Sequence, residues 1–120
     1  MVRYILTMSS DPLQEPVCPT EAALAVIGGR WKVPILWNLF TGTYRFGELS
    51  RKLPGISQKM LTQQLRELES DGLVHREMYP EVPPRVEYSL TKLGESLKHV
   101  IESLSSWGER FLRERPKRAT

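Results

Sequence analysis

The chain has 120 residues, of which 40% are hydrophobic and 26% are charged, the composition of an ordinary globular domain. Its 17 lysines and arginines exceed its 14 acidic residues, and the resulting net charge of +3 permits a polyanionic partner without requiring one. The single cysteine, Cys18, excludes an intramolecular disulfide. We expect a cytoplasmic protein, because the N-terminal apolar run is too short for a signal peptide and no run reaches the length of a membrane span.

The N-terminal third of the chain predicts an arm followed by two helices. Residues 1–17 show no hydrophobic periodicity, so we expect them to form an arm. Cys18 then stands as the N-cap of a short apolar helix with Pro19 at its first position, and Gly28-Gly29 ends that helix. A second helix is predicted from about Lys32 to Phe40.

Two further helices are separated by only a short turn. The third runs from Gly47 to Leu53 and ends at Pro54-Gly55, and Ser57 is a favourable N-cap for the fourth. Gly72 is expected to close the fourth helix in the left-handed conformation. The residues of the fourth helix that recur at helical spacing, and so are expected to point inward, are Met60, Leu61, Leu65 and Leu68.

After Gly72 the hydrophobic period changes to two, which predicts a β-hairpin with a proline-rich tip. Thr91 caps a long final helix, and residues 114–120 form a basic tail. We therefore expect one domain over residues 18–113, mainly α-helical with a small β-hairpin. The apolar residues of the final helix form a stripe that comprises Leu93, Leu97, Val100, Ile101, Leu104, Trp107 and Phe111.

The final helix is longer than so small a core can cover, and an uncovered apolar stripe usually marks an interface. We therefore predict a homodimer. The alternative is that the helix folds back onto its own core. The residues expected at the dimer interface are Leu97, Ile101, Leu104, Trp107 and Phe111.

Two helices joined by a tight turn and followed by a hairpin give the element order of a winged helix-turn-helix, whose second helix enters the DNA major groove. Glutamine can pair with adenine, and arginine or lysine with guanine. Glu67 and Glu69 are expected to lie away from the duplex, near the helix end. A solvated polar face is the alternative, but the hairpin and the acid-free stretch before Glu67 favour DNA. The outward residues expected to contact DNA are Ser57, Gln58, Lys59, Thr62, Gln63 and Arg66.

Arg85 is the one base near the hairpin tip, and Glu81 opposes it. Its guanidinium could enter a minor groove or contact a phosphate, and the alternative is that it only solvates a strand end.

Several motifs in order and spacing resemble the HxlR family of bacterial winged helix-turn-helix transcriptional regulators. The resemblance covers roughly Cys18 to Phe111, and it implies a homodimer built from the N- and C-terminal helices that presents two recognition helices to double-stranded operator DNA. The segments that carry it are Cys18-Pro19, Ile27–Lys32, Arg45–Leu49, Ile56-Ser57, Leu61–Glu69, Asp71–Val74 and Pro83–Thr91.

Cys18 has two interpretations. A cysteine at a helix N-terminus has a lowered pKa, and the family resemblance implies a sensor of oxidants or electrophiles at this place. No second cysteine in the chain can resolve an oxidised sulfur, so sensing would need an intersubunit disulfide or direct alkylation. The alternative is a helix cap without redox duty.

Two other functions compete with DNA binding. An enzyme could pair Cys18 with His75 or His99, but no phosphate loop or nucleophile elbow accompanies them, and their spacing is not that of a metal site. We expect neither catalysis nor a cofactor. A winged helix that binds protein instead of DNA is the second rival, and the donors retained on the fourth helix argue against it.

Overall fold

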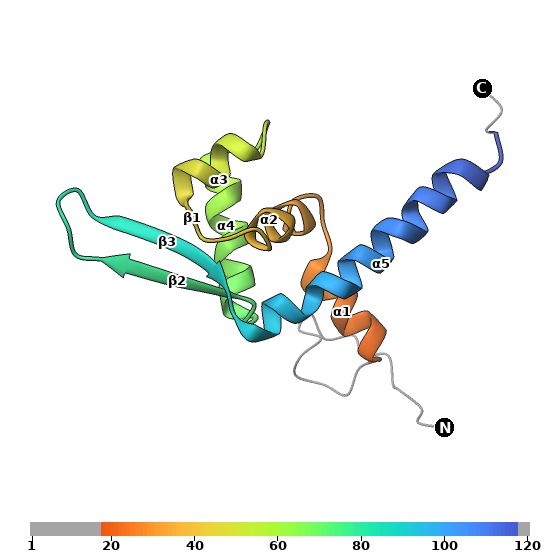
Figure 1. The fold of residues 1–120 in the computed structure, drawn as a ribbon, viewed down its shortest axis with the longest axis horizontal. Coiled ribbons are helices and arrows are strands. Elements are labelled where there is room, and N and C mark those ends of the chain that lie inside the picture. The colour runs from red at the N-terminus through yellow and green to blue at the C-terminus, as the bar shows by residue number, and fades with distance from the viewer. Residues whose placement is uncertain (1–17, 118–120) are drawn as a thin grey trace.

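The computed structural model describes residues 18–117, and within them the chain forms five helices and one three-stranded antiparallel sheet (Figure 1). This is the predicted winged helix-turn-helix architecture. The expected arm at residues 1–17 and the last three residues of the tail lie outside the described residues. The elements are α1 (Pro19–Ile27), α2 (Lys32–Leu39), β1 (Tyr44–Arg45), α3 (Phe46–Lys52), α4 (Gln58–Ser70), β2 (Val74–Tyr79), β3 (Arg85–Leu90) and α5 (Lys92–Glu114).

Local hydrogen bonds fix both ends of α4. The Ser57 hydroxyl accepts a hydrogen bond from the backbone N–H of Met60 at 3.0 Å, as expected of an N-cap. At the other end Gly72 has φ +79° and its N–H donates to the backbone carbonyl of Glu69. The N–H of Leu73 donates to the Leu68 carbonyl. These two bonds form a Schellman motif, so the predicted left-handed cap is confirmed.

The sheet joins the helix-turn-helix, formed by α3 and α4, to the wing, which is the hairpin of β2 and β3. Its strand order is β1-β3-β2, and Tyr44 on β1 lies opposite Tyr88 on β3. The hairpin of β2 and β3 is paired from Val74↔Leu90 to Tyr79↔Arg85. Because β1 leads directly into α3, its pairing with β3 fixes the hairpin beside the two helices.

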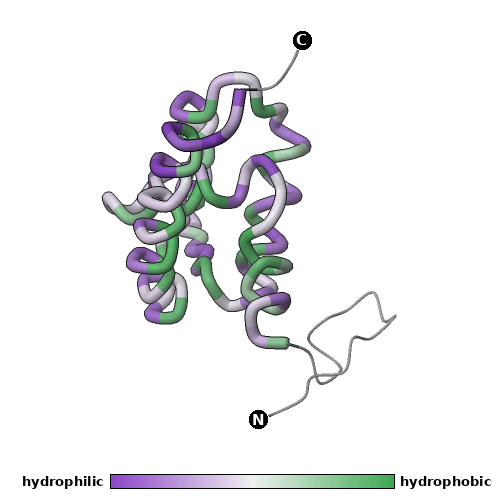
Figure 2. The backbone as a smooth tube through the Cα atoms, turned by 90° about the vertical axis from the view of Figure 1, so that its right-hand side faces the viewer, coloured by the Kyte–Doolittle hydropathy of each residue, from purple (hydrophilic) through white to green (hydrophobic). Residues whose placement is uncertain are grey.

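The core lies where the helices meet the base of the sheet, and hydrophobic and hydrophilic residues alternate along the helices as amphipathic packing requires (Figure 2). The prediction that Met60 points inward is wrong: it lies about 100° around α4 from Leu61 and is only partly buried. The fully buried side chains are Ile35, Leu36, Leu49, Leu61, Leu65, Leu68 and Ile101.

Only the first half of α5 packs against the body of the protein. The Thr91 hydroxyl donates to the Gly72 carbonyl at 2.6 Å and accepts from the N–H of Gly94, which seats the helix start against the end of α4. Ile101 is 1% exposed and belongs to the core of its own chain, which α5 joins through its contacts with α2 and β3. It does not lie on the exposed stripe where we expected it.

The second half of α5 extends away from the body (Figure 1), and its apolar residues remain exposed. Trp107 is 63% exposed and stacks on Phe111 with ring centroids 5.5 Å apart. None of the helices between residues 18 and 117 has the length and apolar character needed to cross a membrane.

Candidate DNA-binding surface

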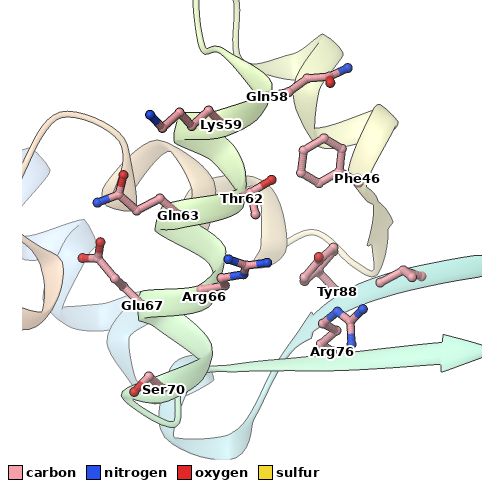
Figure 3. Close-up of a pocket in the computed structure, with 11 residues that line it drawn as sticks. Phe46, Gln58, Lys59, Thr62, Gln63, Arg66, Glu67, Ser70, Arg76 and Tyr88 are labelled. Carbon is pink, nitrogen blue, oxygen red and sulfur yellow. The ribbon is translucent and has the colours of Figure 1, made fainter.

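An open groove of about 810 Å³ lies between α4 and the face of the hairpin (Figure 3). One wall is α4, and the other is formed by β2, β3 and the start of α3. The residues from α4 are Gln58, Lys59, Thr62, Gln63, Arg66, Glu67 and Ser70, and those from the other elements are Phe46, Arg76, Val86 and Tyr88.

The groove brings together five of the seven residues that the sequence predicted to contact DNA. They recur every three or four residues along α4, opposite the buried leucines, so one helix face carries them all. Ser57 is exposed at the end of this face, where its hydroxyl caps the helix. The five residues in the groove are Gln58, Lys59, Thr62, Gln63 and Arg66.

Arg85, the remaining predicted residue, lies outside this groove and is held by its own hairpin. Its guanidinium lies 4.0 Å from the centroid of the Tyr79 ring and pairs with Glu81 at 3.2 Å and Glu87 at 3.8 Å. The Arg85 side chain is 28% exposed, so it is more than a solvated strand end. It lines a smaller hollow beside Phe46, between the wing loop and the start of α3.

Arg76 is a groove residue that sequence reasoning missed. It lies opposite Tyr88 in the hairpin, and paired residues in an antiparallel sheet share a face, so Arg76 faces α4 together with this buried tyrosine (Figure 3). The signal was present in the sequence: Val74 points inward, and residues two apart on a strand point to the same side. Arg76 adds a second guanidinium beside Arg66.

Glu67 is the one acid among the described residues that line the groove, although the sequence placed it away from the duplex. The Lys32 ammonium donates to its carboxylate at 2.7 Å. This hydrogen bond lowers the pKa of Glu67, and a hydrogen bond from the Gln63 side chain contributes. Glu69 lines a smaller adjoining hollow with Arg66 and Arg76. The groove therefore combines cationic and amide donors with one acid, Glu67, whose negative charge is compensated by Lys32.

Residues 26–116 match the family model described as HxlR-like helix-turn-helix. The chain belongs to the HxlR-like family. Its relatives are named as transcriptional regulators: it is 52% identical over 103 residues to the HTH-type transcriptional regulator YdeP of Bacillus subtilis, covering 86% of this chain and 79% of YdeP. It is 50% identical over 118 residues to an HTH-type transcriptional regulator of Methanothermobacter thermautotrophicus, covering 90% of each chain.

A solved structure of the redox regulator HypR in its reduced form has the same fold. The identity is 49% and the TM-score 0.75, and the match covers 81% of this chain and 95% of HypR. The winged-helix fold of this HxlR-like chain is thus shared with proteins that are described as regulators.

Cys18 lies at the N-cap of α1 in the HxlR-like chain, as predicted. The thiol is partly exposed and makes no side-chain capping bond. The backbone N–H groups of Glu21 and then Thr20 lower the pKa of Cys18, because as hydrogen-bond donors they stabilise the thiolate. Within residues 18–117 no group of three or more His, Cys, Asp and Glu side chains is placed to hold a metal ion.

Proposed function

We propose that this HxlR-like protein regulates transcription by binding operator DNA with α4 in the major groove. The observation that carries the proposal is the groove face of α4, where four donor side chains with complementary chemistry gather on one side of one helix. Gln58 and Gln63 suit the adenine edge, and Lys59 and Arg66 suit guanine or phosphate.

The surrounding residues suit contacts to the DNA backbone. The exposed N-terminus of α4 at Ser57 presents helix amides to a phosphate. Arg76 on the opposite wall adds a fixed positive charge. Arg85 can contribute if a phosphate replaces Glu81 as its partner, because this carboxylate is half exposed and readily released.

We further propose that the protein acts as a homodimer through α5. Six large hydrophobic residues of this helix are exposed in the single chain, more than scattered surface residues would explain. A second copy of the same helix would cover them and place two α4 helices on a palindromic site. The exposed residues are Leu93, Val100, Leu104, Trp107, Phe111 and Leu112.

A role for Cys18 as a sensor of oxidants or electrophiles is also part of the proposal. The likeness to HypR, described as a redox regulator, supports it, as does the lowered pKa of the Cys18 thiol. With one cysteine per chain, an oxidant such as diamide would take two electrons and two protons from the Cys18 thiols of two subunits and leave one intersubunit disulfide.

Operator binding measured before and after diamide, for the native protein and for Cys18→Ser, tests this role. We expect diamide to change the affinity of the native protein only. If diamide left the affinity of the native protein unchanged, Cys18 would occupy the N-cap of α1 without acting as a sensor.

The same groove bears on the two rival functions. A winged helix that binds only protein has no need of four donors on one face of α4, so we favour DNA. We propose no enzymatic activity for this chain, and a regulator of transcription would act in the cytoplasm beside the chromosome.

The deciding experiment is selection from a random duplex library with the purified protein, followed by affinity measurement on the enriched and on an unselected duplex. We expect an enriched near-palindromic sequence bound roughly 10³-fold or more tightly than the unselected duplex, and a loss of that preference in a Gln63→Ala, Arg66→Ala double variant. No enrichment over the input library would contradict the proposed function.

A further inference from the structure

Lys32 is a buried charge whose partner belongs to the DNA-reading helix. It lies in the first turn of α2 and is 7% exposed, so its ammonium has left bulk water. Its Nζ lies 2.7 Å from the carboxylate of Glu67, which is 35 residues later in the chain and belongs to α4. Burying an ammonium costs free energy unless a charged partner compensates it. The buried ammonium of Lys32 therefore depends on its ion pair with Glu67.

Glu67 is in turn a groove residue. Its side chain is 43% exposed and lies one helical turn after Gln63, on the same wall (Figure 3). DNA that occupied the groove would bring phosphates toward an acid, and a bare carboxylate there would repel them. Lys32 compensates this charge from the first turn of α2, and it does not itself line the groove.

We propose that Lys32 is a positioning residue for DNA recognition that acts through Glu67. The lysine compensates the charge of the one acid among the described groove residues and holds its carboxylate against α2, so that this acid does not repel a duplex from the wall that Gln63 and Arg66 also line. This inference rests on the proposed function, because it concerns the same groove.

A merely structural tie between α2 and α4 is the competing explanation, and a double-mutant cycle separates the two. The proteins are the native chain, Lys32→Met, Glu67→Gln and the double variant. The probes are the duplex selected by the native protein and an unselected duplex of the same length. Lys98→Met is the matched control, because it removes the same charge from an exposed site on α5 that does not line the groove.

With Glu67 present, we expect Lys32→Met to weaken binding to both duplexes about 5- to 10-fold, because charge repulsion does not depend on base sequence. In the Glu67→Gln background the same change should alter the affinity by less than about twofold. Glu67→Gln alone should bind the unselected duplex as tightly as the native chain or more tightly, and Lys98→Met should lose less than about twofold.

An equal loss from Lys32→Met in both backgrounds would overturn the inference, since the lysine would then act by packing. A loss from Glu67→Gln on the selected duplex alone would also overturn it, since Glu67 would then read a base. If Lys32→Met fails to unfold cooperatively on heating, Lys32→Gln takes its place in the cycle with the same expectations. A native protein that enriches no duplex refutes the proposed function instead, so the two failures are distinguishable.

Discussion

Gln63 and Arg76 reach the same groove from different elements, and their chemistry predicts different tasks. The Gln63 amide is uncharged and has the donor and acceptor that a base edge requires. Arg76 carries a charge on the strand wall, where we expect a phosphate of a bound duplex to be its partner. At the scale of single residues, sequence readout and backbone attraction are thus separable.

Replacing Gln63 by Ala should cost about 1–3 kcal/mol on the selected duplex and little on an unselected one, because an amide releases no counterions. Replacing Arg76 by Ala should weaken both duplexes to a similar extent and reduce the salt slope of binding by about 1. Affinities measured across a salt series check both statements. Arg113→Ala, an exposed arginine on the last turn of α5, is the charge-matched control. Equal losses for Gln63→Ala on both duplexes would remove Gln63 from base readout.

At the scale of elements, the position of α5 depends on a close approach at its first turn. A Cβ built on Gly94 would collide with the carbonyl oxygen of Leu73, a backbone atom that accepts a hydrogen bond from the N–H of Thr91. No side chain fits there, so a glycine at this position lets α5 begin directly against the end of α4.

Gly94→Ala should therefore destabilise the fold by more than about 2 kcal/mol, although alanine favours helices. Gly47→Ala is the matched control, because its Cβ would meet only the end of the Arg51 side chain at 3.5 Å; it should stabilise the protein by roughly 0.5–1 kcal/mol. Denaturant unfolding measures both. A Gly94→Ala protein as stable as the native chain would show that α5 can shift without cost.

The Lys32–Glu67 pair between α2 and α4 predicts how stability depends on pH. The pKa of Glu67 is lower in the folded protein than in the unfolded chain, so its contribution is complete above about pH 4.3, the ordinary glutamate value, and is lost as the pH falls through the folded pKa. Native and Glu67→Gln proteins should differ by about 0.5–1 kcal/mol at neutral pH and converge in acid.

Unfolding free energies from pH 7 down to pH 3 check this convergence. Glu69→Gln, an exposed change on the same helix, controls for the general effect of removing an acid. A difference between native and Glu67→Gln proteins that stays constant down to pH 3 would contradict the assignment.

At the scale of the whole molecule, the wing and the outer half of α5 extend in different directions from one small core (Figure 1). A core of this size gives the outer half of α5 nothing to pack against, so its apolar residues stay exposed in the single chain. The proposed dimer supplies that partner, and it links the spacing of the two α4 helices to the packing of α5.

Trp107→Asp should convert the protein to a monomer at micromolar concentration and lower its operator affinity by about 10²-fold or more, because the two half-sites would no longer be bound together. Sedimentation and DNA binding measure the two effects. Ser106→Asp adds the same charge about 100° further around α5 and should leave both unchanged. A dimer that survives Trp107→Asp would place the interface elsewhere.

The sequence by itself determined the elements and the face of α4, because caps and periodicity are local interactions. Ser57, Gly72 and Thr91 act within a few residues of their own helix ends, and the spacing of Leu61, Leu65 and Leu68 puts the five polar groove residues on the other side. Arg76 could also have been predicted from its spacing to Val74. The HxlR-like family was recognisable for the same reason, since its motifs lie in these local signals.

Only the tertiary structure decided which side chains meet across the fold. Lys32 and Glu67 are 35 residues apart, and nothing in either local pattern pairs them. Arg85 was a predicted DNA contact with a solvated strand end as the alternative, and only the tertiary structure places its guanidinium beside Tyr79, Glu81 and Glu87 of the hairpin. Ile101 is part of an apolar stripe in the sequence, and only the depth at which α5 docks makes it core while Trp107 stays exposed. Periodicity fixes the face of a helix, but what covers that face depends on how the elements pack.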